Sequence, residues 1–100
     1  MASADDRAWG ETFVLERAGK YIDFTTVLRG FASSALIHMG MQSHPESGAV
    51  AKDAALAREV LDLLSLLREK TRGNLTPEEE RFFDSLLTDL RLKFIEAFPR

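Results

Sequence analysis

The sequence predicts an all-α fold of three helices, and three observations support this class. Apolar residues recur at steps of three and four along three stretches of the chain, which is the period of an amphipathic helix. Each stretch is preceded by a residue that can cap a helix N-terminus. Proline and glycine are few, with 3 and 6 among 100 residues, and β-branched residues are sparse. We therefore expect a single small helical domain.

The last two helices are predicted to form an antiparallel hairpin on which the three-helix unit is built. The first, over residues 53–72, ends at Gly73, a residue free to adopt the left-handed conformation that ends many helices. The second, over residues 77–97, opens with a capping box between Thr76 and Glu79. The predicted inward stripes are Leu56, Val60, Leu63, Leu64 and Leu67 in the first helix, and Phe83, Leu86, Leu87, Leu90 and Phe94 in the second.

An antiparallel pairing about this turn would place Glu59 and Asp62 within one helical turn of Arg91. We therefore expect an ion pair between the two helices at that point. An exposed ion pair contributes only about 0–1 kcal/mol, so this pair would fix the register of the helices more than it would stabilise them.

The remaining helix is predicted over residues 24–39, with Asp23 as its N-cap and Gly40 at its end. Its stripe includes Phe24, Leu28 and Phe31, and its small residues at 32–35 would let another helix approach closely. Residues 40–52, rich in turn-forming residues, are expected to be a loop.

Residues 1–22 show no sustained period and are treated as an N-terminal arm, separate from a helical domain over residues 23–100. The arm carries large apolar groups at Trp9, Phe13 and Tyr21. Two interpretations stay open: a flexible tail, or an arm that packs on its own core or on a neighbouring subunit.

No residue pattern in the chain indicates catalysis, a cofactor or a metal site. Cysteine is absent, which excludes disulfides and cysteine-based zinc sites, and no glycine-rich phosphate loop occurs. His38 and His44, with Glu46 nearby, lack the spacing of helical metal ligands. We therefore expect that the protein is not an enzyme and needs no cofactor.

Charge and hydropathy argue against nucleic acid and membrane as partners. The net charge of −3 disfavours nucleic acid, whose binding depends on cationic contacts to phosphate. No apolar run is long enough to span a membrane, and the acidic start does not resemble a signal peptide. These features predict a cytoplasmic protein.

The sequence holds more large apolar residues than a three-helix unit of this size can enclose, because they spread around much of each helix. Apolar patches beyond a few hundred Å² are uncommon on monomers, so we expect a homo-oligomer, most simply a two-fold dimer. The candidate interface residues are Trp9, Phe13, Phe24, Phe31, Leu61, Leu66, Phe82, Leu92 and Ile95.

Five segments of the chain resemble a bacterial family that is known only as a domain of unknown function, DUF1844. The resemblance covers roughly residues 22–97, and its segments are 23–24, 32–40, 45–48, 61–64 and 69–91, the last being the most specific. The family has no assigned activity, cofactor or catalytic residue. The resemblance therefore implies a small, soluble, helical bacterial protein and adds no mechanism.

Three functions remain open from the sequence. The leading hypothesis is a non-enzymatic protein that self-associates through the apolar faces of its helices. The alternative is an accessory subunit that docks on a larger enzyme or assembly, with the N-terminal arm as one contact. A third hypothesis is a small apolar ligand bound between the helices.

Overall fold

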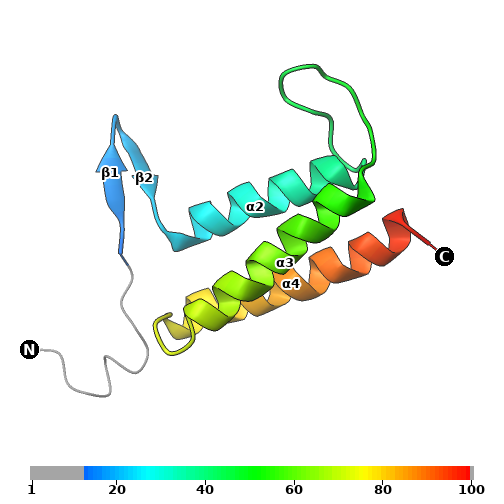
Figure 1. The fold of residues 1–100 in the computed structure, drawn as a ribbon. Helices are drawn as coiled ribbons and strands as arrows, with labels where there is room; N and C mark the ends of the chain where they lie inside the picture. The colour runs from blue at the N-terminus through cyan, green and yellow to red at the C-terminus, as the bar shows by residue number, and fades with distance from the viewer. Residues whose placement is uncertain (1–12, 100) are drawn as a thin grey trace, which may run out of the picture.

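The computed structural model describes residues 13–99, which form three helices and one short antiparallel sheet (Figure 1). The elements in chain order are β1 (Leu15–Arg17), β2 (Lys20–Ile22), α2 (Phe24–His38), α3 (Ala54–Lys70) and α4 (Pro77–Ala97). Every helix begins and ends within two residues of its predicted bounds, so the mostly helical fold is confirmed. The sheet was not predicted, and the all-α class is corrected to that extent.

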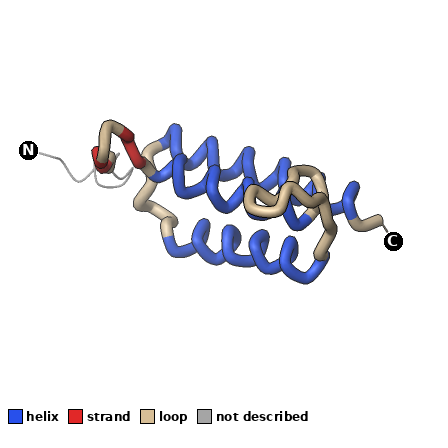
Figure 2. The backbone as a smooth tube through the Cα atoms, turned by 90° about the horizontal axis from the view of Figure 1, so that it is seen from above, coloured by secondary structure: helices blue, strands red, loops and turns tan. Residues whose placement is uncertain are grey.

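The three helices pack against one another in every combination. In Figure 1 and Figure 2, α3 lies across one side of α2 and α4, so one of its faces is turned away from both. α3 and α4 follow each other along the chain and are in contact, but α2 packs on each of them as well. This arrangement does not establish the α3–α4 hairpin as the unit on which the fold is built.

Each helix begins where the sequence supplies an acceptor for the first free N–H groups. Asp23 accepts a hydrogen bond from the Thr26 N–H at 3.0 Å, and Asp53 accepts one from the Leu56 N–H at 3.0 Å. Before α4, Thr76 and Glu79 bond each other's backbone N–H groups reciprocally, as predicted. These bonds fix the starting residues of the helices.

The core is formed by one stripe from each helix together with Leu75 from the turn between α3 and α4. The stripe of α4 is the predicted one, with Phe83, Leu87 and Leu90 buried. The other buried apolar residues are Leu28, Ala32, Ala35 and Met39 of the α2 region, Ala57, Val60, Leu61 and Leu64 of α3, and Ala97 of α4.

The predicted stripe of α3 is wrong in part. Leu56 and Leu63 were expected inside but are 41% and 45% exposed, whereas Leu61, expected at an interface, is only 6% exposed. The helix is rotated so that Ala57, which is fully buried, faces the core. α2 also contributes small buried residues, and small side chains let helix backbones approach closely. The rotation leaves two leucines of α3 outside the core.

The N-terminal arm contains a β-hairpin that was not predicted from the sequence. Arg17 pairs with Lys20 across a two-residue turn at Ala18 and Gly19, whose φ angles are both positive, at 52° and 77°. Hairpin turns of this kind usually carry asparagine or aspartate before glycine, so Ala-Gly gave no signal. The strands are exposed throughout, and the hairpin stands away from the helices in Figure 1. Its described residues therefore do not cover the helical core.

The loop between α2 and α3 is tied to the C-terminal end of α4 by Lys52. Its ammonium group donates a hydrogen bond to the Ala97 carbonyl at 2.9 Å and lies 5.9 Å from the centre of the Phe98 ring. Gly40, at the end of α2, has φ +74°, and a Cβ there would lie 2.8 Å from Cγ of Lys52. Gly40 is thus needed both for its backbone conformation and for the space that Lys52 occupies.

We predict that Gly40→Ala destabilises the protein more than Gly73→Ala does. Both glycines have positive φ, but a Cβ on Gly73 would meet no atom within 4 Å. Strain alone makes Gly73→Ala cost about 1 kcal/mol. Gly40→Ala should cost about 1 kcal/mol more, because Lys52 must move and its hydrogen bond is disturbed. Denaturant unfolding of the two variants measures the difference, and equal losses would contradict the prediction.

Candidate interaction surface

The outer face of α3 is an apolar surface that no other residue among 13–99 covers. We define it by its three exposed leucines, Leu56, Leu63 and Leu66, which are 41%, 45% and 57% exposed. They line a shallow open hollow that runs along the helix together with Ala55, Arg58, Glu59 and Asp62. The apolar row is therefore bordered by side chains of both charges.

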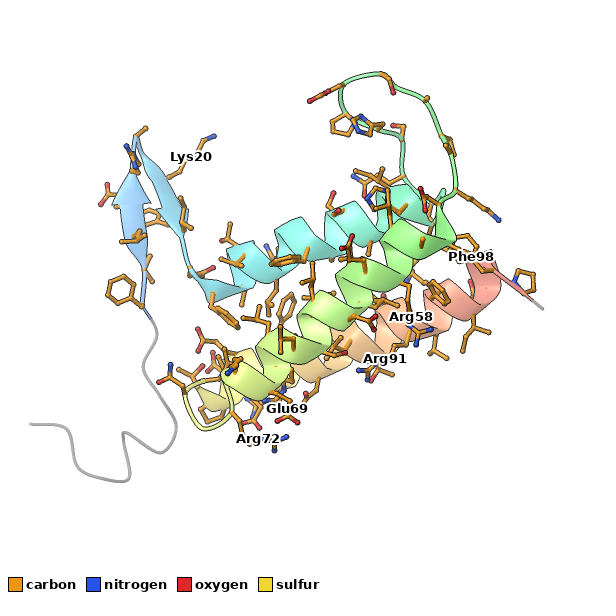
Figure 3. The ribbon with its side chains drawn as sticks, viewed as in Figure 1. Lys20, Arg58, Glu69, Arg72, Arg91 and Phe98 are labelled. Carbon is orange, nitrogen blue, oxygen red and sulfur yellow. The ribbon has the colours of Figure 1, made fainter. Side chains whose placement is uncertain are left out.

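A second groove lies between α3 and α4 and joins the outer face of α3 at Arg58 and Asp62. It is lined by Arg58, Leu61, Asp62, Ser65, Arg91, Phe94 and Ile95. Figure 3 shows the labelled Arg58 and Arg91 extending from the two neighbouring helices in this region. Both hollows are open to solvent, so they suit contact with a protein surface better than enclosure of a small molecule.

The structure divides the predicted interface residues into two groups. Leu66, Leu92 and Ile95 are 57%, 57% and 65% exposed, and Phe13 is 73% exposed, so these four are available for contact. Leu61 is buried within its own chain, and three phenylalanines pack against the core: Phe24, Phe31 and Phe82. Trp9 lies outside the described residues.

Contacts within the chain partly cover two of these phenylalanines, Phe24 and Phe82. The rings of Phe24 and Phe83 are tilted against each other with their centres 5.9 Å apart. The guanidinium of Arg29 lies 5.7 Å from the centre of the Phe82 ring. Neither contact follows from the period of a single helix, so the sequence could not show that these rings have partners.

The predicted ion pair between Arg91 and Glu59 or Asp62 is not formed. Arg91 donates a hydrogen bond to Ser65 Oγ at 2.9 Å, and Asp62 is bonded by Arg58 of its own helix at 3.4 Å. Arg91 therefore meets α3 about one turn closer to the α3–α4 connection than predicted. A simple antiparallel pairing rule does not include the angle at which the two helices cross.

Arg68 supplies the ion pairs that do join α3 to α4. It donates to Asp84 and to Glu80, each at 2.8 Å, and only 18% of its side chain is exposed. Its guanidinium also lies 5.9 Å from the centre of the Phe83 ring. The hydrogen bond from Arg68 lowers the pKa of Asp84, and the same bond raises the pKa of Arg68. The pattern of a single helix does not predict this pair, because Glu80 and Asp84 lie 12 and 16 residues from Arg68 along the chain.

Among residues 13–99, the two histidines are not part of a group that could hold a metal ion. His38 and His44 line one hollow near the loop between α2 and α3, but the described part of the chain holds no group of three side chains suited to a metal ion. His44 Nδ1 accepts a hydrogen bond from the Glu46 N–H at 3.2 Å. Within the same residues, no helix combines the length and apolarity needed to cross a membrane.

Comparison with known proteins identifies the family. The model of the domain of unknown function DUF1844 matches residues 21–96, which contain nearly all of the three helices and the outer face of α3. The chain belongs to the DUF1844 family. Searches of curated proteins and of solved structures returned no significant match. Neither the family nor a matched protein supplies a function for this DUF1844 domain, so its own surface is the basis for the proposal below.

We predict that acid weakens the link between α3 and α4. Because Arg68 holds the pKa of Asp84 below the usual 3.8, the carboxylate stabilises the fold above about pH 4 and loses this effect as the pH falls through its lowered pKa. Asp84→Asn should lower the free energy of unfolding by about 0.5 kcal/mol near neutral pH, since the pair is partly exposed.

Denaturant unfolding at several pH values tests this, and the difference between Asp84→Asn and the natural chain should shrink as the pH falls from about 4 through the lowered pKa of Asp84. Arg68→Gln supplies the matched background, in which Asp84→Asn should have little effect. A difference that persists in acid, or in the Arg68→Gln background, would show that the pair is not its cause.

Proposed function

We propose that this DUF1844 protein is a non-enzymatic interaction protein that self-associates through the outer face of α3. One observation carries the proposal: Leu56, Leu63 and Leu66 form a row on a helix face that no other described part of the chain covers. Rows of this kind on α-helices are typical of contact between polypeptides. A second copy of the chain offers the same row.

The expected affinity is modest. The leucines of two facing rows, each about half exposed before contact, would contribute about 4–8 kcal/mol on burial. Association costs about 4–15 kcal/mol in lost freedom of motion, so the leucines alone give at best a weak dimer. The rest would come from the second groove and from charges bordering the row. With these contributions we expect a dissociation constant in the micromolar range, which corresponds to a binding free energy on the order of −8 kcal/mol.

We further propose where the protein acts, which symmetry its oligomer has, and which unit presents the interface. The protein acts in the cytoplasm of a bacterial cell, which agrees with its acidic composition and with its resemblance to a bacterial family. The homo-oligomer is a two-fold dimer, which is the commonest symmetric assembly. The α3–α4 hairpin is the unit that presents the interface, which the ion pairs of Arg68 to Glu80 and Asp84 support.

A second candidate function is an accessory subunit that docks through the β-hairpin. One face of the hairpin carries Leu15 opposite Ile22, which are 54% and 38% exposed. Among residues 13–99 the sheet has two strands, so within this part of the chain each strand also has one edge without a neighbour. Such an edge can accept a strand from another polypeptide. A monomer that binds a different protein through this hairpin would fit this alternative.

We predict that Leu66→Ser weakens the dimer at least about tenfold. Leu92→Ser is the matched control, because Leu66 and Leu92 are both 57% exposed but Leu92 lies on α4, outside the outer face of α3. Light scattering and sedimentation from about 5 to 500 µM measure the dissociation constant. A natural chain that stays monomeric throughout, or equal effects of the two variants, would refute the proposal.

We predict for the alternative that a double variant, Leu15→Ser with Ile22→Ser, loses the partner that co-purifies with the natural chain. Tyr21→Ser is the control, since Tyr21 is exposed on the opposite face of the same hairpin. Affinity purification from the native cell, followed by reconstitution of the purified pair, gives the readout. Retention of the partner by the double variant would exclude the hairpin face as its docking site.

A further inference from the structure

Two exposed charged residues continue the spacing of the leucine row on α3. The row and these residues occupy positions 56, 59, 63, 66 and 70, which are Leu, Glu, Leu, Leu and Lys. The steps of three, four, three and four are those of the a and d positions of a coiled coil. Glu59 and Lys70 are exposed, and neither forms an ion pair with any described residue.

From this pattern we infer that α3 pairs with α3 of a second copy as an antiparallel coiled coil whose two-fold axis passes between Leu63 and Leu66. This inference deepens the proposed function and rests on it. In this register Leu63 of each chain lies opposite Leu66 of the other, and Leu56 of each falls opposite Gly73, just beyond the end of the other α3. Glu59 of each chain then lies opposite Lys70 of the other, so two ion pairs flank an apolar centre.

Other arrangements of the same two faces place unlike groups together. A parallel pair brings each residue opposite its own copy, so Glu59 meets Glu59 and Lys70 meets Lys70, with repulsion at both ends. Shifting the antiparallel pair by one heptad, so that Leu66 meets Leu56, brings Leu63 opposite Glu59 and desolvates that carboxylate against a leucine. The register centred between Leu63 and Leu66 avoids both costs.

The remaining charges beside the row are compatible with this register. Asp62 and Glu69 would come near each other across the dimer, and both are acidic. Each already has an arginine on its own side of the dimer, since Arg58 bonds Asp62 at 3.4 Å and Arg72 bonds Glu69 at 2.7 Å. The two carboxylates therefore do not face each other as unpaired charges.

Disulfide trapping tests the register, because the chain has no cysteine of its own. Glu59→Cys and Lys70→Cys are prepared as two full-length proteins, then mixed and oxidised at a concentration where the natural chain is dimeric. The mixture should give a crosslinked heterodimer, in which the second Glu59–Lys70 pair stays intact. Each protein alone should give little crosslink, since its cysteines lie about 16 Å apart along the helix axis.

The outcomes separate this inference from the proposed function. A natural chain that is monomeric overturns both. A dimer that Leu66→Ser weakens, but whose Glu59→Cys chain crosslinks to itself, keeps the outer face of α3 as the interface and overturns the antiparallel register. A dimer of the natural chain without crosslinks in either mixture or single protein overturns the register as well.

Charge exchange gives an independent measure. Glu59→Lys and Lys70→Glu should each raise the dissociation constant on the order of tenfold at low salt, because each turns two attractive pairs into repulsive ones. The variant with both changes should recover most of the natural affinity, since positions 59 and 70 again carry opposite charges that face each other across the dimer. Failure of the double change to recover affinity would contradict the antiparallel register.

Discussion

α3 carries more apolar surface than its two neighbouring helices can cover, and the rest of the structure depends on which of its faces they bury. α3 packs on α2 and α4 through Ala57, Val60, Leu61 and Leu64, which are all buried. A helix lying on one side of two others has a third face that neither can reach, and on α3 this face holds Leu56, Leu63 and Leu66. The same rotation that completes the core therefore creates the exposed row. The orientation of α3 thus determines both which of its residues form the core and which leucines are exposed.

The parts of the fold that could be predicted from sequence are those fixed by local chemistry. Helix starts depend on a side chain three residues before the N–H that it bonds, as with Asp23 and Thr26 or Thr76 and Glu79, so the signal lies within four residues. After α2, Gly40 follows the C-cap Met39 and has the expected positive φ, whereas Gly73 also has positive φ but lies two residues beyond Thr71, the C-cap of α3. The positions of the three helices follow from these signals.

The parts that could not be predicted depend on contacts between distant residues. Periodicity alone allows two stripes on α3, one through Leu56 and Leu63 and one through Ala57 and Leu61, because leucines occupy both faces. The choice depends on the small buried residues of α2, which a single-helix pattern does not include. Four of the predicted interface residues are exposed: Leu66, Leu92, Ile95 and Phe13. The exposure of Leu56 and Leu63, which complete the row on α3, could not be predicted because it follows from the rotation of the helix.

The two proposed contact surfaces differ in their relation to the family. The DUF1844 match begins at residue 21, so α3 lies wholly inside it, whereas β1, at Leu15–Arg17, lies outside. A dimer built on α3 would use the part of the chain that defines the domain, and it can be sought in other members of the family. A partner held by the β-hairpin would use a segment that the family model largely omits. Because α3 carries charges in a self-complementary order as well as leucines, we propose self-association, rather than docking through the hairpin, as the leading function of the domain.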